Sequence, residues 1–446
     1  MPLRIGIHES PESRTYITLM DGKTIDIPVE KELTSRSLED KSQIKEVEIG
    51  EGVVEIGWGA FDGCTNLTSV ILSDSVTKIG RNAFWGCTGL TSITIPDSVT
   101  EIDSSAFGKC TGLTSIVVSS GNTAFDSREN CNAIIETATN KFIVGCINSV
   151  IPDSVTEIDW IAFKGCTALT SITIPDSVTK IDSNAFDGCT GLTSIVISQG
   201  NKVYDSRNNC NAIIETKSNK LIKGCNNTVL PDSVTAIGDS AFKLCTGLTS
   251  ITIPDMVTVI GREAFNGCTG LTDVTIPNSV SMIDYQAFNG CTGLTSIIIP
   301  AKMIGFEAFK DCTGLTSITI SDSVIKIGGW AFNGCTSLTS VVIPDSVKML
   351  EEQTFRGCAN LESVTIGSGV IDFGGGATFN DCNNLKKIFM RVNDPSQITC
   401  IAGARLGGQQ ATVYVPGDKT VVKAYKSKTI WKAFAKIENY EIDDKN

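Results

Sequence analysis

The cysteines are the residues of this chain with the widest chemical capacity. The 446-residue sequence holds seventeen of them, which is enough for disulfides, a metal site or a nucleophile. A thiol at a fixed repeat position is typical of a small apolar core residue, so we expect a ladder of buried free thiols. Twelve cysteines each lie three residues after a recurring phenylalanine: Cys64, Cys87, Cys110, Cys166, Cys189, Cys245, Cys268, Cys291, Cys312, Cys335, Cys358 and Cys382. Cys131 with Cys146, and Cys210 with Cys225, are spaced so that a disulfide worth about 3 kcal/mol is conceivable.

The remaining reactive residues form no catalytic pattern. The single histidine, His8, precedes the repeats, so no Ser-His or Cys-His pair and no zinc spacing is recognisable. The glycines near Gly329 and Gly374 lack the spacing of a phosphate loop. Aspartates that recur in turns are expected to cap backbone groups, with weak calcium binding along their aligned edge as the alternative: Asp74, Asp97, Asp153, Asp176, Asp232, Asp255, Asp322 and Asp345. We therefore predict that the chain is not an enzyme and has no catalytic, cofactor or metal site.

A repeat of 23 residues positions the cysteines and most of the core. Leu90, Ile93 and Ile95 alternate with polar residues as in a strand with one buried face, and Pro96 ends that strand. A period of 20 to 29 residues with this Leu-x-x-Ile-x-Ile pattern predicts a leucine-rich repeat solenoid. We expect a β-rich solenoid of roughly 14 coils with a parallel sheet on its concave face. The phenylalanines that mark the coils are Phe61, Phe84, Phe107, Phe163, Phe186, Phe242, Phe265, Phe288, Phe309, Phe332, Phe355 and Phe379.

Two intervals between successive marker phenylalanines are longer than the repeat, from Phe107 to Phe163 and from Phe186 to Phe242. Each contains an additional unit, which begins at Phe125 or at Tyr204 and holds two short apolar runs around a polar turn. These units predict hairpin-like inserted coils at about 121–150 and 200–229. The sequence predicts an N-terminal cap over 1–43, the solenoid over 44–385 and a C-terminal cap over 386–446.

Charge and hydropathy exclude several classes of partner. The net charge of −12 and a pI near 4.8 argue against nucleic acid and anionic membranes. No apolar stretch is long enough to cross a bilayer, and the first residues lack the apolar segment of a signal peptide. We expect no nucleic-acid binding and no membrane insertion.

The repeated phrase "AFxGCTGLTSITIPDSVTxI", the inserted "NAIIETxxNKLIxGC" and the closing "VYVPGD" resemble the BspA-like class of bacterial leucine-rich repeat proteins. The resemblance covers residues 44 to 437. It implies a right-handed solenoid with adhesion or binding roles at a bacterial surface, on the cell or secreted. Because no export signal is recognisable, a cytoplasmic location is the alternative.

Two surfaces of the repeat differ in their variability. Solvent-facing strand positions such as Ser92 and Thr94 hold small uncharged residues, most of which carry a hydroxyl. This suits a plain β surface or, as the alternative, adhesion to a polymer or ice. The position two residues after the last core residue of each coil changes chemistry from coil to coil. Aromatic and arginine side chains dominate interface hot spots, so we predict partner binding by residues at this position, together with Trp85 and Trp330 nearby. The predicted residues are Trp58, Arg81, Trp85, Trp160, Arg262, Tyr285, Phe306 and Trp330. The alternative is that these rings fold over neighbouring coils.

The pattern favours a non-catalytic binding or adhesion scaffold for a protein or glycan partner. The alternative is a structural spacer or appendage component, cellular or viral, in which the solenoid supplies length. The sequence leaves the ligand and the oligomeric state open.

Overall fold

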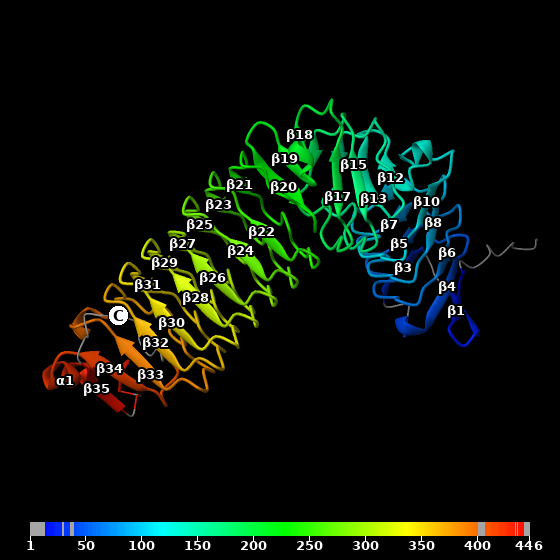
Figure 1. Ribbon diagram of the computed structural model, residues 1–446. Coiled ribbons are helices and arrows are strands. Elements are labelled where there is room, and N and C mark those ends of the chain that lie inside the picture. Colours follow the sequence, from blue (N-terminus) through cyan, green and yellow to red (C-terminus); the bar gives the residue numbers. More distant parts are fainter. Residues whose placement is uncertain are drawn as a thin grey trace, which may run out of the picture. The chain divides into compact units, whose positions relative to one another are not determined.

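The computed structural model describes residues 14–28, 31–35, 40–399, 406–432, 434 and 436–440. His8 and the seventeenth cysteine, Cys400, lie outside the described residues. The chain divides into two compact units, Met1–Asp205 and Ser206–Asn446 (Figure 1), which we call unit 1 and unit 2. Both are built from stacked β coils, which confirms the predicted leucine-rich repeat solenoid.

Each coil of unit 1 contributes one long and one short strand. Strands of neighbouring coils pair in parallel in the register of the repeat, for example Ser92 with Ser115 and Lys78 with Glu101. The long strands are β4 (Ile44–Ile49), β6 (Ser69–Ile71), β8 (Ser92–Ile95), β10 (Ser115–Val118), β15 (Ser171–Ile174) and β17 (Ser194–Ile197). The short strands are β3 (Glu32–Leu33), β5 (Glu55–Ile56), β7 (Lys78–Ile79), β9 (Glu101–Ile102), β14 (Glu157–Ile158) and β16 (Lys180–Ile181).

Unit 1 begins with a hairpin and is interrupted by the first inserted coil. β1 (Arg14–Leu19) pairs antiparallel with both β2 (Thr24–Pro28) and β4, and the 3₁₀ turn η2 (Lys41–Gln43) leads into β4. In the inserted coil, β12 (Ala133–Glu136) pairs antiparallel with β11 (Phe125–Asp126) and with β13 (Lys141–Gly145). The turn between β11 and β12 is η3 (Arg128–Asn130), and β18 (Tyr204–Asp205) closes the unit.

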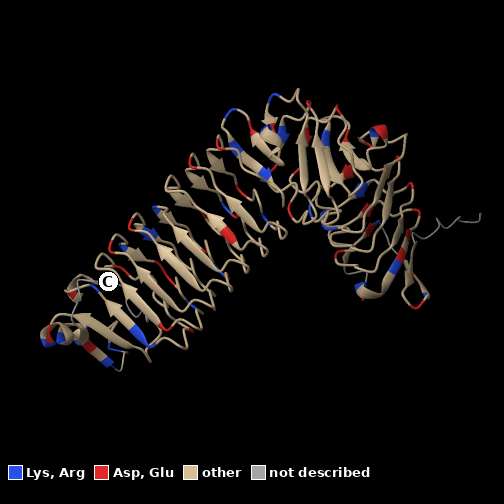
Figure 2. Cartoon of the chain, in the orientation of Figure 1, with Lys and Arg blue, Asp and Glu red and all other residues tan. Residues whose placement is uncertain are grey.

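Unit 2 repeats this architecture. It starts with the 3₁₀ turn η4 (Arg207–Asn209) and the antiparallel pair β19 (Ala212–Glu215) and β20 (Lys220–Gly224). The short strands are β21 (Ala236–Ile237), β23 (Val259–Ile260), β25 (Met282–Ile283), β27 (Met303–Ile304), β29 (Lys326–Ile327) and β31 (Met349–Leu350). The long strands, which carry few charged residues (Figure 2), are β22 (Ser250–Thr252), β24 (Asp273–Thr275), β26 (Ser296–Ile299), β28 (Ser317–Ile320), β30 (Ser340–Ile343) and β32 (Ser363–Ile366).

The described residues form about 17 turns, whereas the sequence predicts roughly 14. The parallel pairing begins at β3 and continues after β32 through β33 (Lys387–Met390), β34 (Thr412–Pro416) and β35 (Lys436–Tyr440), where the repeat phrase is no longer recognisable. The 3₁₀ turn η5 (Pro395–Gln397) and the helix α1 (Lys419–Ser427) connect these last strands. Backbone pairing therefore extends the stack beyond the residues that show the sequence pattern.

Stacked phenylalanine rings lie at the centre of the core, in separate runs that are interrupted at the inserted coils. The ring of Phe84 is fully buried and lies 5.2 Å from Phe61 and 5.3 Å from Phe107, nearly parallel to both. The twelve cysteines of the repeat position follow the same ladder and are buried without disulfides, as predicted. Cys131, Cys146, Cys210 and Cys225 are also buried and form no disulfide, so the conceivable pairs Cys131/Cys146 and Cys210/Cys225 are not bonded in this structure. The Cys87 thiol donates a hydrogen bond to the Phe61 carbonyl of the preceding coil at 3.1 Å, and that buried carbonyl also accepts from the Cys64 amide of its own turn.

Threonine hydroxyls connect successive coils at the surface. The side chain of Thr114 donates to the Thr91 carbonyl at 3.1 Å, and Thr193 donates to Thr170 at 3.2 Å. These hydrogen bonds explain why a threonine recurs at this position of the repeat. Its hydroxyl bonds to the backbone of the preceding coil and so holds the two coils together.

Candidate functional site

The variable positions lie directly after the short strands, and we call them the flank positions. In the first complete coil, the Gly57 amide donates to the Leu33 carbonyl of the preceding coil at 2.7 Å, which completes the short-strand pairing. The chain then turns outward at Trp58, whose side chain is 66% exposed. A tryptophan exposed to this degree on a rigid framework is available for contact with a partner.

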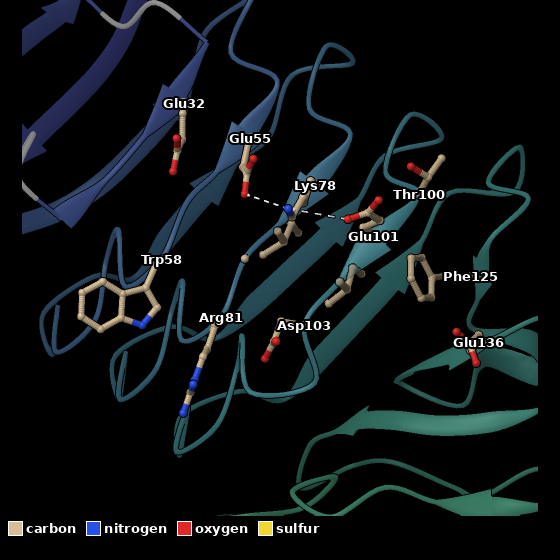
Figure 3. Close-up of a pocket in the computed structure, with 13 residues that line it drawn as sticks. Glu32, Glu55, Trp58, Lys78, Arg81, Thr100, Glu101, Asp103, Phe125 and Glu136 are labelled. Carbon is tan, nitrogen blue, oxygen red and sulfur yellow. Dashed lines mark ion pairs between the residues drawn. The ribbon is translucent and has the colours of Figure 1, made fainter.

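A groove of about 550 Å³ lies over β5, β7 and β9 of unit 1 (Figure 3), and we call it the unit 1 groove. Its floor is formed by the outward side chains of the short strands, Glu55, Lys78 and Glu101, together with Glu32 of β3. Its other lining side chains include Trp58 and Arg81 at flank positions, Asp103 directly after β9, and Phe125 and Glu136 of the first inserted coil. The groove thus combines a repeated sheet with the side chains of an insertion.

The parallel register determines which charges meet in the groove. Glu32 pairs with Glu55, Glu55 with Lys78, and Lys78 with Glu101. The Lys78 ammonium lies 3.2 Å from Glu55 Oε1 and 3.7 Å from Glu101 Oε2, and its hydrogen bond to Glu55, followed by the charges of both glutamates, raises the pKa of Lys78.

Carboxylates outnumber cations in the groove. The acidic lining residues are Glu32, Glu55, Glu101, Asp103 and Glu136, and the basic ones are Lys78 and Arg81. Lys78 is engaged by two of these acids, so the groove offers unneutralised carboxylates beside an exposed indole. Such a surface attracts a cationic ligand.

Trp85 and Trp160, also in unit 1, fold over neighbouring coils. The ring of Trp85 lies 5.5 Å from the Lys109 ammonium and 5.7 Å from that of Lys164, and a methyl group at Gly108 would lie 2.2 Å from that ring. Trp160 donates from Nε1 to Ser104 Oγ at 2.9 Å and is 42% exposed. Packing onto a neighbouring coil therefore accounts for part of the aromatic surface.

The unit 2 flank carries a stack of three planar groups. The Arg262 guanidinium lies 5.0 Å from the Tyr285 ring, and that ring lies 6.0 Å from Phe306 at an angle of 6°. Phe306, the last group of the stack, is 38% exposed. Trp330 lies separately, between the Lys310 ammonium at 5.5 Å and the Arg356 guanidinium at 5.9 Å.

The structure thus brings the predicted residues together in small groups. Trp58 and Arg81 share the unit 1 groove, and Arg262, Tyr285 and Phe306 share one stack.

Sequence reasoning missed Lys78, Glu101, Phe125 and Glu136, which line the same groove as Trp58. The available signal was the charged residue just before the last core isoleucine of three successive coils, which is Glu, Lys and then Glu.

The described side chains offer binding contacts and no reactive nucleophile in the groove. The lining holds acids, bases, apolar groups and the hydroxyl of Thr100, but no serine, cysteine or histidine. Burial raises the pKa of the Cys64 and Cys110 thiols to about 12, which keeps them protonated and unreactive at neutral pH. Across the described ranges, no three His, Cys, Asp or Glu side chains gather closely enough to hold a metal ion. The helix in the described part of the chain is too short to span a bilayer.

Comparison with known proteins places the repeat in one family. The family model described as a BspA type leucine rich repeat region, in six copies, matches residues 31–144, 144–223, 212–304 and 302–403. No curated protein matches the chain.

Several solved structures are similar to the chain. One is a leucine rich cell surface protein from Faecalibacterium prausnitzii, which is 28% identical over 88% of this chain and 97% of its own, with a TM-score of 0.49. Another is a leucine-rich repeat protein from Bacteroides ovatus, which is 25% identical over 89% of this chain and 100% of its own, with a TM-score of 0.41.

Proposed function

The chain belongs to the family of BspA type leucine-rich repeat proteins, and we propose that it is a non-catalytic binding scaffold for a protein or glycan partner. The family resemblance supports a role in adhesion, with the scaffold on a bacterial surface or secreted. The stacked coils supply a rigid support, and the flank positions supply the contacts.

The exposed aromatic flank is the observation that carries this proposal. Trp58 is 66% exposed beside a groove of about 550 Å³, while the framework residues around it repeat almost unchanged. An exposed indole gains little for the fold, whereas it contributes strongly when a partner covers it. The Arg262–Tyr285–Phe306 stack presents planar groups in unit 2 in the same sequence position.

The test compares two sets of exposed side chains on the same protein. A flank variant replaces Trp58, Trp160, Tyr285 and Phe306 with alanine, as the sequence pattern suggests. A matched control variant replaces Ile71, Val117, Ile298 and Val342, which are 47–64% exposed on the long strands. Each purified protein is applied to a peptide array and a glycan array, and its melting temperature is measured.

We expect the flank variant to lose the ligands of the unmodified chain and the control variant to keep them, with a small change in melting temperature for both. Ligand loss confined to the control variant would assign binding to the long strands instead. If neither array captures the unmodified chain and the purified protein assembles into higher-order particles, the spacer or appendage role replaces the binding role.

A further inference from the structure

The two inserted coils are copies with one informative difference. Both use an asparagine in the same way: Asn122 donates to the carbonyls of Pro96 and Val99, and Asn201 donates to those of Pro175 and Val178. Phe125 of the first copy, however, corresponds to Tyr204 of the second. The copies therefore share these backbone contacts, and at this position they differ by one hydroxyl group.

That hydroxyl group lies at a sheet edge. In unit 1, β9 and β16 are each the last strand of their short-strand sheet. At β16, the Ile181 amide donates to the Tyr204 hydroxyl at 3.2 Å, so a side chain closes the edge. Edge amides without such cover are free to pair with another chain.

The edge of β9 is open. The amides of Glu101 and Asp103 donate back to the preceding coil, at Thr77 and Ile79, so the intervening Ile102 amide faces away from that coil. Phe125 has no hydroxyl, and no residue in the described ranges accepts a hydrogen bond from the Ile102 amide. Ile102 and Phe125 both line the unit 1 groove, so an unused backbone donor lies beside the groove carboxylates.

We propose that the unit 1 groove binds an extended peptide segment that carries lysine or arginine. This rests on the proposed binding function and names the partner of one site within it. A peptide carbonyl accepts the hydrogen bond of the Ile102 amide, as in the addition of a strand to a sheet edge. The cationic side chains of the peptide pair with Glu101 and Glu136, and Trp58 covers the peptide from the flank.

Charge and size favour this occupant. The groove has five carboxylates against two cations, which attracts a cationic chain and disfavours an acidic one. Its volume of about 550 Å³ falls within the range of about 300–1,000 Å³ typical of ligand sites. A neutral glycan could stack on Trp58 but would not need the excess of carboxylates.

The experiment measures the fluorescence anisotropy of a fluorescein-labelled peptide of alternating lysine and alanine, titrated with the full chain. A glutamate–alanine peptide and maltohexaose serve as comparison ligands. We expect affinity for the lysine peptide alone, and we expect it to fall as salt is added because exposed charges are screened.

Variants separate the three contacts. Glu101→Gln and Glu136→Gln should each weaken binding about threefold, and Trp58→Ala about fivefold. Phe125→Tyr should weaken it about fivefold, because the added hydroxyl occupies the Ile102 amide as Tyr204 occupies that of Ile181. Glu48→Gln, on the long strand β4, and Tyr204→Phe, at the second insertion, are the matched controls and should leave the affinity unchanged.

The proposal is overturned if the glutamate peptide or maltohexaose binds as well as the lysine peptide, or if Phe125→Tyr and Glu136→Gln both leave the affinity unchanged. Circular dichroism and the melting temperature establish that each variant is folded. Loss of array ligands in the flank variant without any lysine-peptide binding would reject this partner while leaving the broader binding function intact.

Discussion

Hydrogen exchange should distinguish two backbone amides that occupy equivalent places in the repeat. Ile102 and Ile181 each belong to the last short strand before an insertion. The Ile181 amide donates to the Tyr204 hydroxyl at 3.2 Å, whereas no described residue accepts from the Ile102 amide. A net hydrogen-bond contribution of about 1 kcal/mol corresponds to about fivefold in an equilibrium constant. We therefore expect the Ile102 amide to exchange at least about fivefold faster.

Swapping the two aromatic side chains should reverse the difference between the exchange rates of these two amides. Tyr204→Phe removes the acceptor, so the exchange rate of the Ile181 amide should rise about fivefold. Phe125→Tyr adds an acceptor in the equivalent position, so the rate at Ile102 should fall by a similar factor. Residue-resolved deuterium exchange by NMR, at fixed pH and temperature, measures both rates.

Two amides that neither substitution touches serve as internal references. The Gly80 amide donates to Ile56 at 2.7 Å, and the Asp182 amide donates to Ile158 at 3.2 Å. Their rates should stay constant, which separates a local effect from a general loss of stability. Equal rates at Ile102 and Ile181 in the unmodified chain, unaffected by both substitutions, would refute the open edge at β9.

Two further predictions concern the core. Phe84→Ala should destabilise unit 1 by about 1 kcal/mol more than Phe107→Ala in urea unfolding, because the Phe84 ring stacks on two neighbours and Phe107 on Phe84 alone; equal losses would contradict the stacking argument. Burial raises the pKa of the Cys64 thiol from its ordinary 9.0 to about 12. Above about pH 9 the folded chain therefore binds more protons than the unfolded chain, and the free energy of unfolding should fall as the pH rises from about 9 to about 12. The described thiols should accordingly resist iodoacetamide at pH 8 until urea is added, and rapid labelling of the native chain would show that the ladder is accessible.

The fold was predictable because the repeat encodes it locally. Leu90, Ile93 and Ile95 each have a counterpart in the neighbouring coils, and one coil's pattern predicts the next. The coil count was less predictable, since β33 and β34 pair in the register of the stack without the repeat phrase. Hydrogen bonding between backbones requires extended geometry and not a particular side chain, so the stack continues where the sequence pattern has ended.

The unit 1 groove was harder to predict from the sequence than the fold. Trp58 and Arg81 stand out as variable residues, but the groove also needs Phe125 and Glu136, which come from a different kind of repeat. Their distance from Trp58 depends on how the insertion follows β9. The difference between Phe125 and Tyr204 is visible in the sequence, yet its consequence follows only from the direction of the Ile102 and Ile181 amides.

An insertion in a solenoid creates an unpaired strand edge, which the regular repeat eliminates. In an uninterrupted stack, each short strand pairs with the next, so the amide that faces away from the preceding coil bonds to the following coil. The inserted coil ends this pairing at β9 and at β16, and it must either cover the edge or leave a donor open. The second copy covers it with the Tyr204 hydroxyl, while the first places Phe125 there, beside Glu101 and Glu136. Because Asn122 and Asn201 hold the start of each copy with the same contacts, the missing hydroxyl makes β9 the edge at which a peptide backbone can replace the next coil.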